Sequence, residues 1–340
     1  MRFLRILGLI VFIIIVIVLI LGFFAPTSYE VTRKITIKAP DELVFRHIRY
    51  WSEWQNWSPW AEIDSTMIVS YEGKVGQVGS VYSWEGDPKL TGSGMMVNTG
   101  VTPYGEITYH LQFTEPWESE SDGFFSLDEI EESTEVTWGH LGTMRFPWNV
   151  AALFMNVNKS LGGDFERGLK LLKTICEEEY EIFKQFTIKE IEYPTTKYAM
   201  IRKTIDFAEM GKFFEEAFSE IYQYLGMKTI KPLGAPAALY FSWDDQNKIS
   251  DLAAAVPVKR DIKTDKIETL SLSYPKAVVA DYYGPYEKLV HGHNALDLYF
   301  AQNELTYTGP GLEVYLSDPE KEPDSSKWLT KIYYFVAESD

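Results

Sequence analysis

The seven residues GAPAALY (234–240) recur 75 positions later as GPGLEVY (309–315), with the first glycine and the last tyrosine in register (315 − 240 = 75). A Tyr-Pro pair also occurs twice, at Tyr193 and at Tyr274. Between each Tyr-Pro and the matching heptapeptide, apolar residues recur at helical spacing. This internal duplication predicts two halves, each made of a strand, a helix and a strand pair. We expect the halves to join edge to edge around a shared groove.

The two copies differ at one chemically important position. Glu313 corresponds to Ala238 (313 − 75 = 238), so one half of the groove has a carboxylate where the other has a methyl group. The two-residue period of a strand places Glu313 and Tyr315 on one face and Val314 on the other. A carboxylate among aromatic rings favours a cationic ligand, through charge neutralisation and cation–π contact. The alternative is an exposed glutamate without a function, and the asymmetry of the repeat favours the groove.

Other residues of the duplicated region are candidates for the groove. Tyr240 and Trp243 lie on or just beyond the strand of the first half, where they could form aromatic walls or pack in the core. His293 falls on the apolar stripe of its helix, which favours a hydrogen-bonded core or groove histidine. His291 and His293 are two residues apart and point to different sides of a helix, so we expect no metal site. No cofactor motif accompanies them.

Residues 6–25 read ILGLIVFIIIVIVLILGFFA and carry no charge. As a helix, ~20 residues span ~30 Å, the thickness of the hydrocarbon core of a membrane. A cleaved signal peptide fits less well because Ala25 is followed by Pro26, and a core helix is seldom apolar all round. We therefore expect a single anchor over residues 1–25. The short basic tail favours a cytoplasmic N-terminus with the globular part outside, in the periplasm or extracellular space.

The sequence predicts a first globular unit over residues 26–180. A strand with alternating apolar residues opens it, short helices and a run of strands follow, and a long amphipathic helix closes it. The acidic residues at 177–181 are interpreted as the hinge to a second unit over residues 181–340. The predicted class of the chain is therefore α+β, with an apolar N-terminal helix, an antiparallel sheet with a long helix, and a duplicated β-α-β-β unit.

Three segments of the first unit resemble the START-like, helix-grip superfamily (SRPBCC), which includes polyketide cyclase and dehydrase relatives: WSEWQNWSPW (51–60), GSVYSW (79–84) and GDFERGLKLLK (163–173). The resemblance implies an antiparallel sheet that grips the long helix. It also allows a cavity whose mouth the tryptophans line, although packing of the tryptophans against the sheet is the alternative. A carrier of lipids or other hydrophobic ligands is therefore one functional hypothesis.

Three segments of the second unit resemble the GyrI-like domain, the effector-binding domain of AraC-type regulators: YGPYEKL (283–289), LEVY (312–315) and LTKIYYF (329–335). The resemblance implies a small-molecule pocket that Glu313 faces. We expect Glu313, Tyr315, Tyr240, Trp243 and Tyr283 to bind the ligand. Some relatives hydrolyse strained electrophiles, and by resemblance Glu313 would be the general base and Tyr315 or Tyr283 the proton donor. Binding without turnover is our default hypothesis.

Composition limits the classes of function. The 340 residues contain 32 Lys+Arg and 49 Asp+Glu, a net charge of −17, and the part beyond Arg2 and Arg5 carries −19 (−17 − 2). This charge excludes a general nucleic-acid binder, and no helix-turn-helix precedes the second unit. The single Cys176 excludes a disulfide framework and a cysteine-based zinc site. The expected partners are a small hydrophobic or cationic ligand and a membrane. The sequence does not identify any protein partner and does not exclude one.

Overall fold

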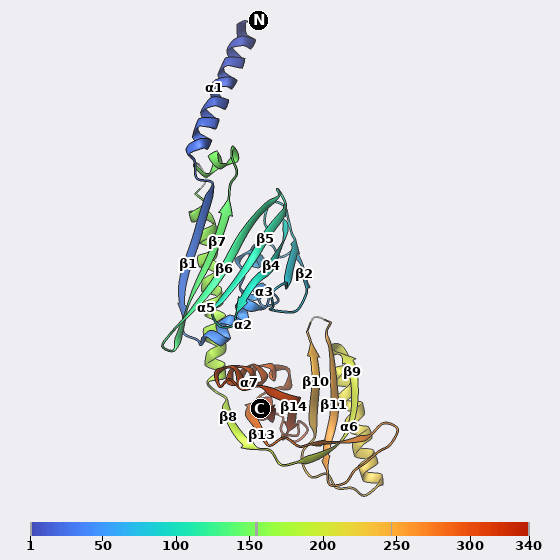
Figure 1. Cartoon of the computed structure of the whole chain (residues 1–340). Helices are drawn as coiled ribbons and strands as arrows, with labels where there is room; N and C mark the ends of the chain where they lie inside the picture. The colour runs from blue at the N-terminus through green and yellow to red at the C-terminus, as the bar shows by residue number, and fades with distance from the viewer. Residues whose placement is uncertain (1, 154–155, 246, 339–340) are drawn as a thin grey trace. The chain divides into compact units, whose positions relative to one another are not determined.

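A computed structural model describes residues 2–153, 156–245 and 247–338. The chain divides into two compact units, Met1–Tyr180 and Glu181–Asp340, and we describe each by itself. Each unit contains an antiparallel sheet and helices (Figure 1). The predicted α+β class is confirmed.

The first unit begins with the apolar helix α1 (Arg2–Phe24). Its seven-stranded sheet has the order β1-β7-β6-β5-β4-β3-β2, and all neighbouring strands are antiparallel. The bounds are β1 (Ser28–Ile37), α2 (Asp41–Arg49), α3 (Trp54–Trp57), α4 (Pro59–Ile63), β2 (Ile68–Glu72), β3 (Val81–Glu85), β4 (Ser93–Thr102), β5 (Glu106–Glu115), β6 (Ser119–Ile130), β7 (Ser133–Thr143), the 3₁₀ helix η1 (Trp148–Leu153) and α5 (Val157–Phe183).

Aromatic side chains form the core of this unit. Trp51, Trp54 and Trp57 are all buried, and their rings contact one another in sequence at centroid distances of 4.7 and 4.8 Å. Trp138 of β7 lies against this group and stacks on Phe165 of α5 at 4.1 Å. The tryptophans at 51, 54 and 57 therefore pack the helices against the sheet, and the indole of each donates a hydrogen bond to a backbone carbonyl.

The acidic segment at 177–181 is helical, which corrects its interpretation as a hinge. Glu179 is half-buried, accepts a hydrogen bond from His47 Nε2 at 2.6 Å and forms an ion pair with Arg46. Burial opposes the charge of Glu179, but these two partners outweigh burial and lower its pKa to about 2. Residues 177–181 continue α5 because an acidic side chain on one face of that helix meets the basic residues of α2.

The second unit has an eight-stranded sheet of order β12-β9-β11-β10-β14-β15-β13-β8. The order is palindromic: β9, β10 and β11 of the first half correspond to β13, β14 and β15 of the second. The halves meet at the β10·β14 pair, which confirms the predicted edge-to-edge join. The bounds are β8 (Thr187–Glu192), β9 (Thr196–Asp206), η2 (Phe207–Glu209), α6 (Met210–Met227), β10 (Ala237–Asp244), β11 (Ile249–Val258), β12 (Glu268–Leu272), β13 (Lys276–Tyr283), η3 (Tyr286–Lys288), α7 (Val290–Gln302), β14 (Tyr307–Tyr315), η4 (Ser325–Lys327) and β15 (Leu329–Val336).

The strand that precedes each half is exchanged with the other half. β8 leads into β9 but pairs with β13, and β12 leads into β13 but pairs with β9. Each exchange passes through a Tyr-Pro pair, and the amide of Tyr193 donates to the carbonyl of Pro275 at 3.3 Å. Proline has no amide to donate and fixes its own φ, so it suits the point where a chain leaves one strand partner for another. The exchanged strands tie the two halves into one sheet.

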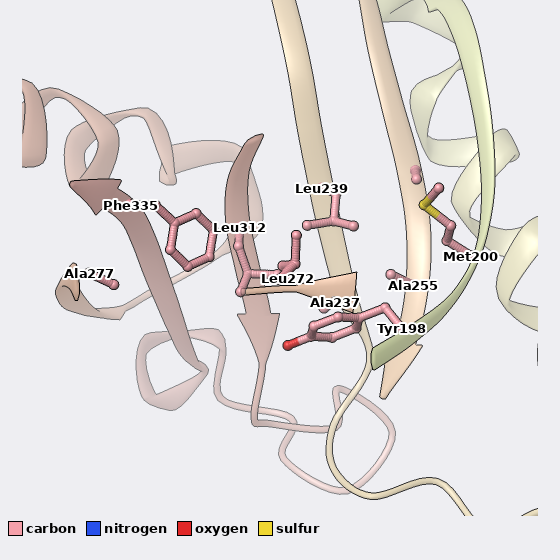
Figure 2. Close-up of a cluster of buried hydrophobic side chains, with 10 residues drawn as sticks. Tyr198, Met200, Ala237, Leu239, Ala255, Leu272, Ala277, Leu312 and Phe335 are labelled. Carbon is pink, nitrogen blue, oxygen red and sulfur yellow. The ribbon is translucent and has the colours of Figure 1, made fainter. Parts of the chain in front are cut away.

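The two faces of this sheet have different coverings. On one face α6 packs against β9 and β11, and α7 packs against β13 and β15. On the other face, side chains of the strands pack against one another in a hydrophobic cluster. Figure 2 shows this cluster, which includes Tyr198, Met200, Leu239, Leu312 and Phe335. Because side chains alternate along a strand, Leu312 and Val314 belong to this second face, and Glu313 belongs to the face of the two helices.

Candidate functional site

Glu313 lies on the pseudo-twofold axis that relates the two halves. Its counterpart by sequence is Ala238, and Ala238 is also the residue opposite it in the antiparallel β10·β14 pair. A residue that is both the counterpart and the partner of another must lie at the axis. Opposite residues in such a pair have Cβ atoms about 4.5–5.5 Å apart, and like charges there destabilise the pair. A symmetric pair of glutamates would therefore repel across the axis, and only one is present.

A cavity of about 1480 Å³ lies over this point, between the two helices. Strands β10 and β14 provide its floor, and α6 and α7 provide its walls. Aromatic side chains continue around it: Trp243 stacks on Phe207 at a centroid distance of 4.2 Å, and Tyr286 contacts Tyr315 at 5.2 Å. Lining side chains used below are Phe207, Phe214, Phe218, Tyr240, Trp243, Tyr286, Glu287, His293, Asp297, Tyr307, Glu313, Tyr315 and Tyr334.

Glu313 is 3% exposed, and its carboxylate is held by three side chains. His293 Nε2 lies 2.7 Å from Oε1, and the Tyr315 hydroxyl donates to Oε2 at 2.5 Å. The Tyr240 hydroxyl also donates to Oε2, at 3.3 Å. On the far side of the imidazole, His293 Nδ1 lies 3.1 Å from the hydroxyl of Tyr334. A buried carboxylate needs such donors to offset the loss of water.

The two tyrosines beside Glu313 remain protonated at neutral pH. Burial, and then the negative charge of Glu313, raise the pKa of both Tyr240 and Tyr315 well above the ordinary value of 10.0. Burial, and then the charge of Asp297, likewise raise the pKa of Tyr334. The phenols are therefore neutral and can donate hydrogen bonds, and all three side chains line the cavity.

The two walls of the cavity differ in polarity at corresponding positions. The turns that precede the helices begin at Phe207 and Tyr286, an offset of 79 (286 − 207). With this offset Phe214 of α6 corresponds to His293 of α7, and both line the cavity. Phe218 corresponds to Asp297, and both of these line it as well. The α6 wall is aromatic where the α7 wall is polar.

The strands next to the floor, β11 in the first half and β15 in the second, show the same difference in polarity. Ala237 pairs with Ala255 in the first half, and its counterpart Leu312 pairs with Tyr333 in the second. The next residue along, Tyr334, therefore corresponds to Val256. Three members of the hydrogen-bonded network in the second half, Glu313, His293 and Tyr334, thus have apolar counterparts in the first: Ala238, Phe214 and Val256.

The structure brings four of the five expected ligand-binding residues together. Glu313, Tyr315, Tyr240 and Trp243 all line the cavity. Tyr283 does not: its side chain is 63% exposed, and it is not among the lining residues. Strand alternation explains this, since Tyr282 at the end of β13 is buried against the α7 side and its neighbour Tyr283 points the other way. Another tyrosine of the same motif, Tyr286, lines the cavity instead.

Residues 185–336 match the family described as the GyrI-like small molecule binding domain. They form a GyrI-like domain. A search of curated proteins finds no match. Solved structures with similar folds include the EcmrR–DNA complex, with 19% identity over 56% of this chain and 76% of that chain and a TM-score of 0.41. The C-terminal domain of EcmrR has 22% identity over 46% and 98%, with a TM-score of 0.36. The Zhui aromatase/cyclase from Streptomyces sp. R1128 has 14% identity over 45% and 96%, with a TM-score of 0.35.

Sequence reasoning missed several lining residues of the GyrI-like domain. It treated His293 as a satisfied histidine without naming its partner, and it did not single out Tyr334 or Tyr307. The signal was present in the repeat: aligning the two helices places His293 opposite Phe214, and a polar residue that replaces an apolar counterpart on a shared groove marks the functional half.

Proposed function

We propose that the chain is a membrane-anchored protein whose GyrI-like domain binds hydrophobic or amphipathic cations in the cavity above Glu313. The observation that carries the proposal is one carboxylate, 3% exposed, at the centre of an aromatic cavity. A cation that stacks on the rings of Tyr240 and Tyr315 gains from both the ring faces and the charge beneath them. Because Glu313 itself is buried, its charge is weakly screened by water.

The charges at the rim support a cationic ligand. Asp245, Glu287, Asp297 and Asp318 line the cavity and are exposed, and no described lining residue is Lys or Arg. Carboxylates around a cleft raise the local concentration of cations before they bind. The aromatic wall of α6, with Phe214 and Phe218, suits the apolar body of an amphipathic ligand.

Three features favour binding over turnover. The hydroxyl of Tyr315 already donates to Glu313, so this proton is not aimed at a substrate. The pKa of Tyr315 lies well above its ordinary value, which makes the phenol a weak proton donor. Tyr283, the other proton donor considered for a hydrolase, lies outside the cavity. The packed tryptophan core of the first unit likewise gives little support to the hypothesis of a lipid carrier.

The N-terminal helix supports the anchor. Among the described residues, one helix is long and apolar enough to cross a membrane, Ile6–Phe24. The buried carboxamide of Asn149 donates hydrogen bonds to the carbonyls of Gly22 at 2.6 Å and Ala25 at 3.0 Å. These contacts make the end of α1 part of the folded unit, as expected of a retained anchor and not of a cleaved signal. The proposed orientation, with the globular units outside the cytoplasm, can be tested by protease protection in intact cells.

Substitution of Glu313 tests the ligand class. The full-length protein in detergent is titrated with rhodamine 6G, a rigid aromatic cation, and with Nile red, a neutral dye of similar size. Glu313→Gln keeps the shape of the side chain and removes its charge, so it should weaken rhodamine 6G binding about ten- to hundred-fold. Nile red binding should change by less than about two-fold, because a neutral dye gains nothing from the charge.

Glu287→Gln is the matched control. Glu287 also lines the cavity but is exposed, so water and salt screen its charge and its substitution should change the affinity less than about two-fold. If Glu313→Gln leaves rhodamine 6G affinity unchanged, the cation proposal is wrong. If rhodamine 6G and Nile red lose affinity equally, Glu313 maintains the shape of the cavity and does not select charge.

A further inference from the structure

The end of the first sheet that faces α1 has an unusual surface. The pairing of neighbouring strands shows which residues lie at the same level along the strand direction. Ser28 of β1 pairs with Thr143 of β7, and Gly142 of β7 pairs with Ser121 of β6. Continued beyond the strand ends, these registers place Trp117, in the β5–β6 turn, level with Phe146 and with Ala25 at the end of α1. Three separate segments of the chain therefore reach the same level.

Large apolar side chains are exposed at this level. Trp117 is 76% exposed and Trp148 is 79% exposed, and Phe146 and Leu153, which are near Trp148 in sequence, are also exposed. Trp117 and Trp148 are the two exposed tryptophans of the described part of the first unit, and its other tryptophans are buried or half-buried. We call Trp117, Phe146, Trp148 and Leu153 the apolar collar. Exposed apolar clusters on a folded surface indicate a partner.

The collar is attached to the membrane helix. Besides the hydrogen bonds of Asn149 to Gly22 and Ala25, the ring of Phe146 and the side chain of Val150 lie over Gly22, where an added Cβ would come within 3.0–3.1 Å of them. Gly22 has no side chain, so the loop can approach the helix this closely. The collar therefore adjoins the end of the segment that would span the membrane, where hydrocarbon gives way to headgroups.

We propose that the apolar collar inserts into the interfacial layer of the lipid bilayer beside α1. Trp and Phe side chains concentrate in this layer, because an indole places its ring among the acyl chains and its N–H among polar groups. The inference rests on the proposed anchoring and adds a second, peripheral contact. With this contact the first unit is fixed against the membrane surface and does not swing freely on a tether.

Quenching by lipid tests the collar in the full-length protein. The protein is reconstituted into phosphatidylcholine vesicles with and without acyl chains brominated near the headgroup, and tryptophan emission is compared. The chain has ten tryptophans, so quenching confined to Trp117 and Trp148 removes about a fifth of the emission. The Trp117→Phe/Trp148→Phe variant should lose nearly all quenching. Trp243→Phe, which removes an exposed tryptophan of the second unit, should retain it.

Each outcome separates the two proposals. Protein that leaves the vesicles in an alkaline wash overturns the anchoring and the collar together. Protein that stays in the vesicles but shows no quenching keeps its anchor and overturns the collar. Quenching that persists in the double variant also overturns the collar, because other residues then contact the lipid. An unchanged melting temperature of the double variant checks that both substitutions leave the fold intact.

Discussion

The two halves of the GyrI-like domain have the same backbone plan and different chemistry. The first half has Ala238, Phe214 and Val256 at the positions where the second has the cavity-lining Glu313, His293 and Tyr334. Aromatic positions of the floor are matched, with Tyr240 in one half and Tyr315 in the other. We infer that the duplication provides the groove, and that divergence of one half provides the polar site.

The position of the carboxylate explains why one half had to remain apolar. A glutamate on the axis has its own counterpart as its cross-strand neighbour, so symmetry would bury two like charges side by side. With a single carboxylate, donors from both halves can serve it: Tyr240 from the first, and Tyr315 and His293 from the second. The site is therefore asymmetric in charge but draws on both halves for hydrogen bonds.

Restoring symmetry with Ala238→Glu should have the largest effect. The new carboxyl group would lie across the strand pair from Glu313, at a position that is fully buried. The cost is the burial of a second like charge, about 3 kcal/mol in the free energy of unfolding near pH 7. Urea unfolding, with hydrogen exchange of the β10 amides to assign the effect to this domain, measures it.

Ala238→Gln is the control, with a side chain of similar shape and no charge. The difference between the two variants should shrink as the pH falls toward 5, because protonation of one carboxyl group removes the repulsion. Equal destabilisation by Glu and Gln across this range would show that the position excludes bulk and not charge, and the explanation from the axis would fail.

Sequence alone predicted the asymmetry at 313 and 238, because a repeat with a fixed offset makes a lone difference visible. It also predicted the edge-to-edge halves and the alternation that turns Glu313 toward the groove. It did not predict the exchange of β8 and β12, since a strand sequence does not specify which of two equivalent edges it joins. It placed Tyr283 in the pocket because motif matching does not settle the face of a strand.

Making the α7 wall like the α6 wall should have the second-largest effect on stability. His293→Phe copies the residue of the first half and leaves Oε1 of Glu313 without its nearest donor. A buried acceptor without a partner costs about 1–3 kcal/mol, so the variant should unfold at lower urea concentration. Hydrogen exchange in β14, which carries Glu313, should accelerate in the same variant.

The double variant His293→Phe/Glu313→Ala removes both partners and makes the second half resemble the first. It should be less destabilised than the sum of its single substitutions by about 1–2 kcal/mol, since no unpaired carboxylate remains. Strict additivity of the two substitutions would mean that the 2.7 Å contact contributes no coupling.

The smallest effect is a change in stability at alkaline pH, and it involves one tyrosine from each half. The folded-state pKa values of Tyr240 and Tyr315 lie above 10.0, first through burial and then through the charge of Glu313. A raised folded-state pKa contributes stability that is fully present below the unfolded pKa, near 10, and is lost as the pH rises through the folded value. Wild-type stability should therefore fall above pH 10. Glu313→Gln should lower both phenol pKa values and flatten this fall, as ¹³C-tyrosine NMR and urea unfolding at pH 8 and above 10 can measure.

Because the carboxylate lies on the axis, both tyrosines should respond. A response of Tyr315 alone would mean that the first half does not sense the charge, and that the 3.3 Å bond from Tyr240 is not a working part of the site.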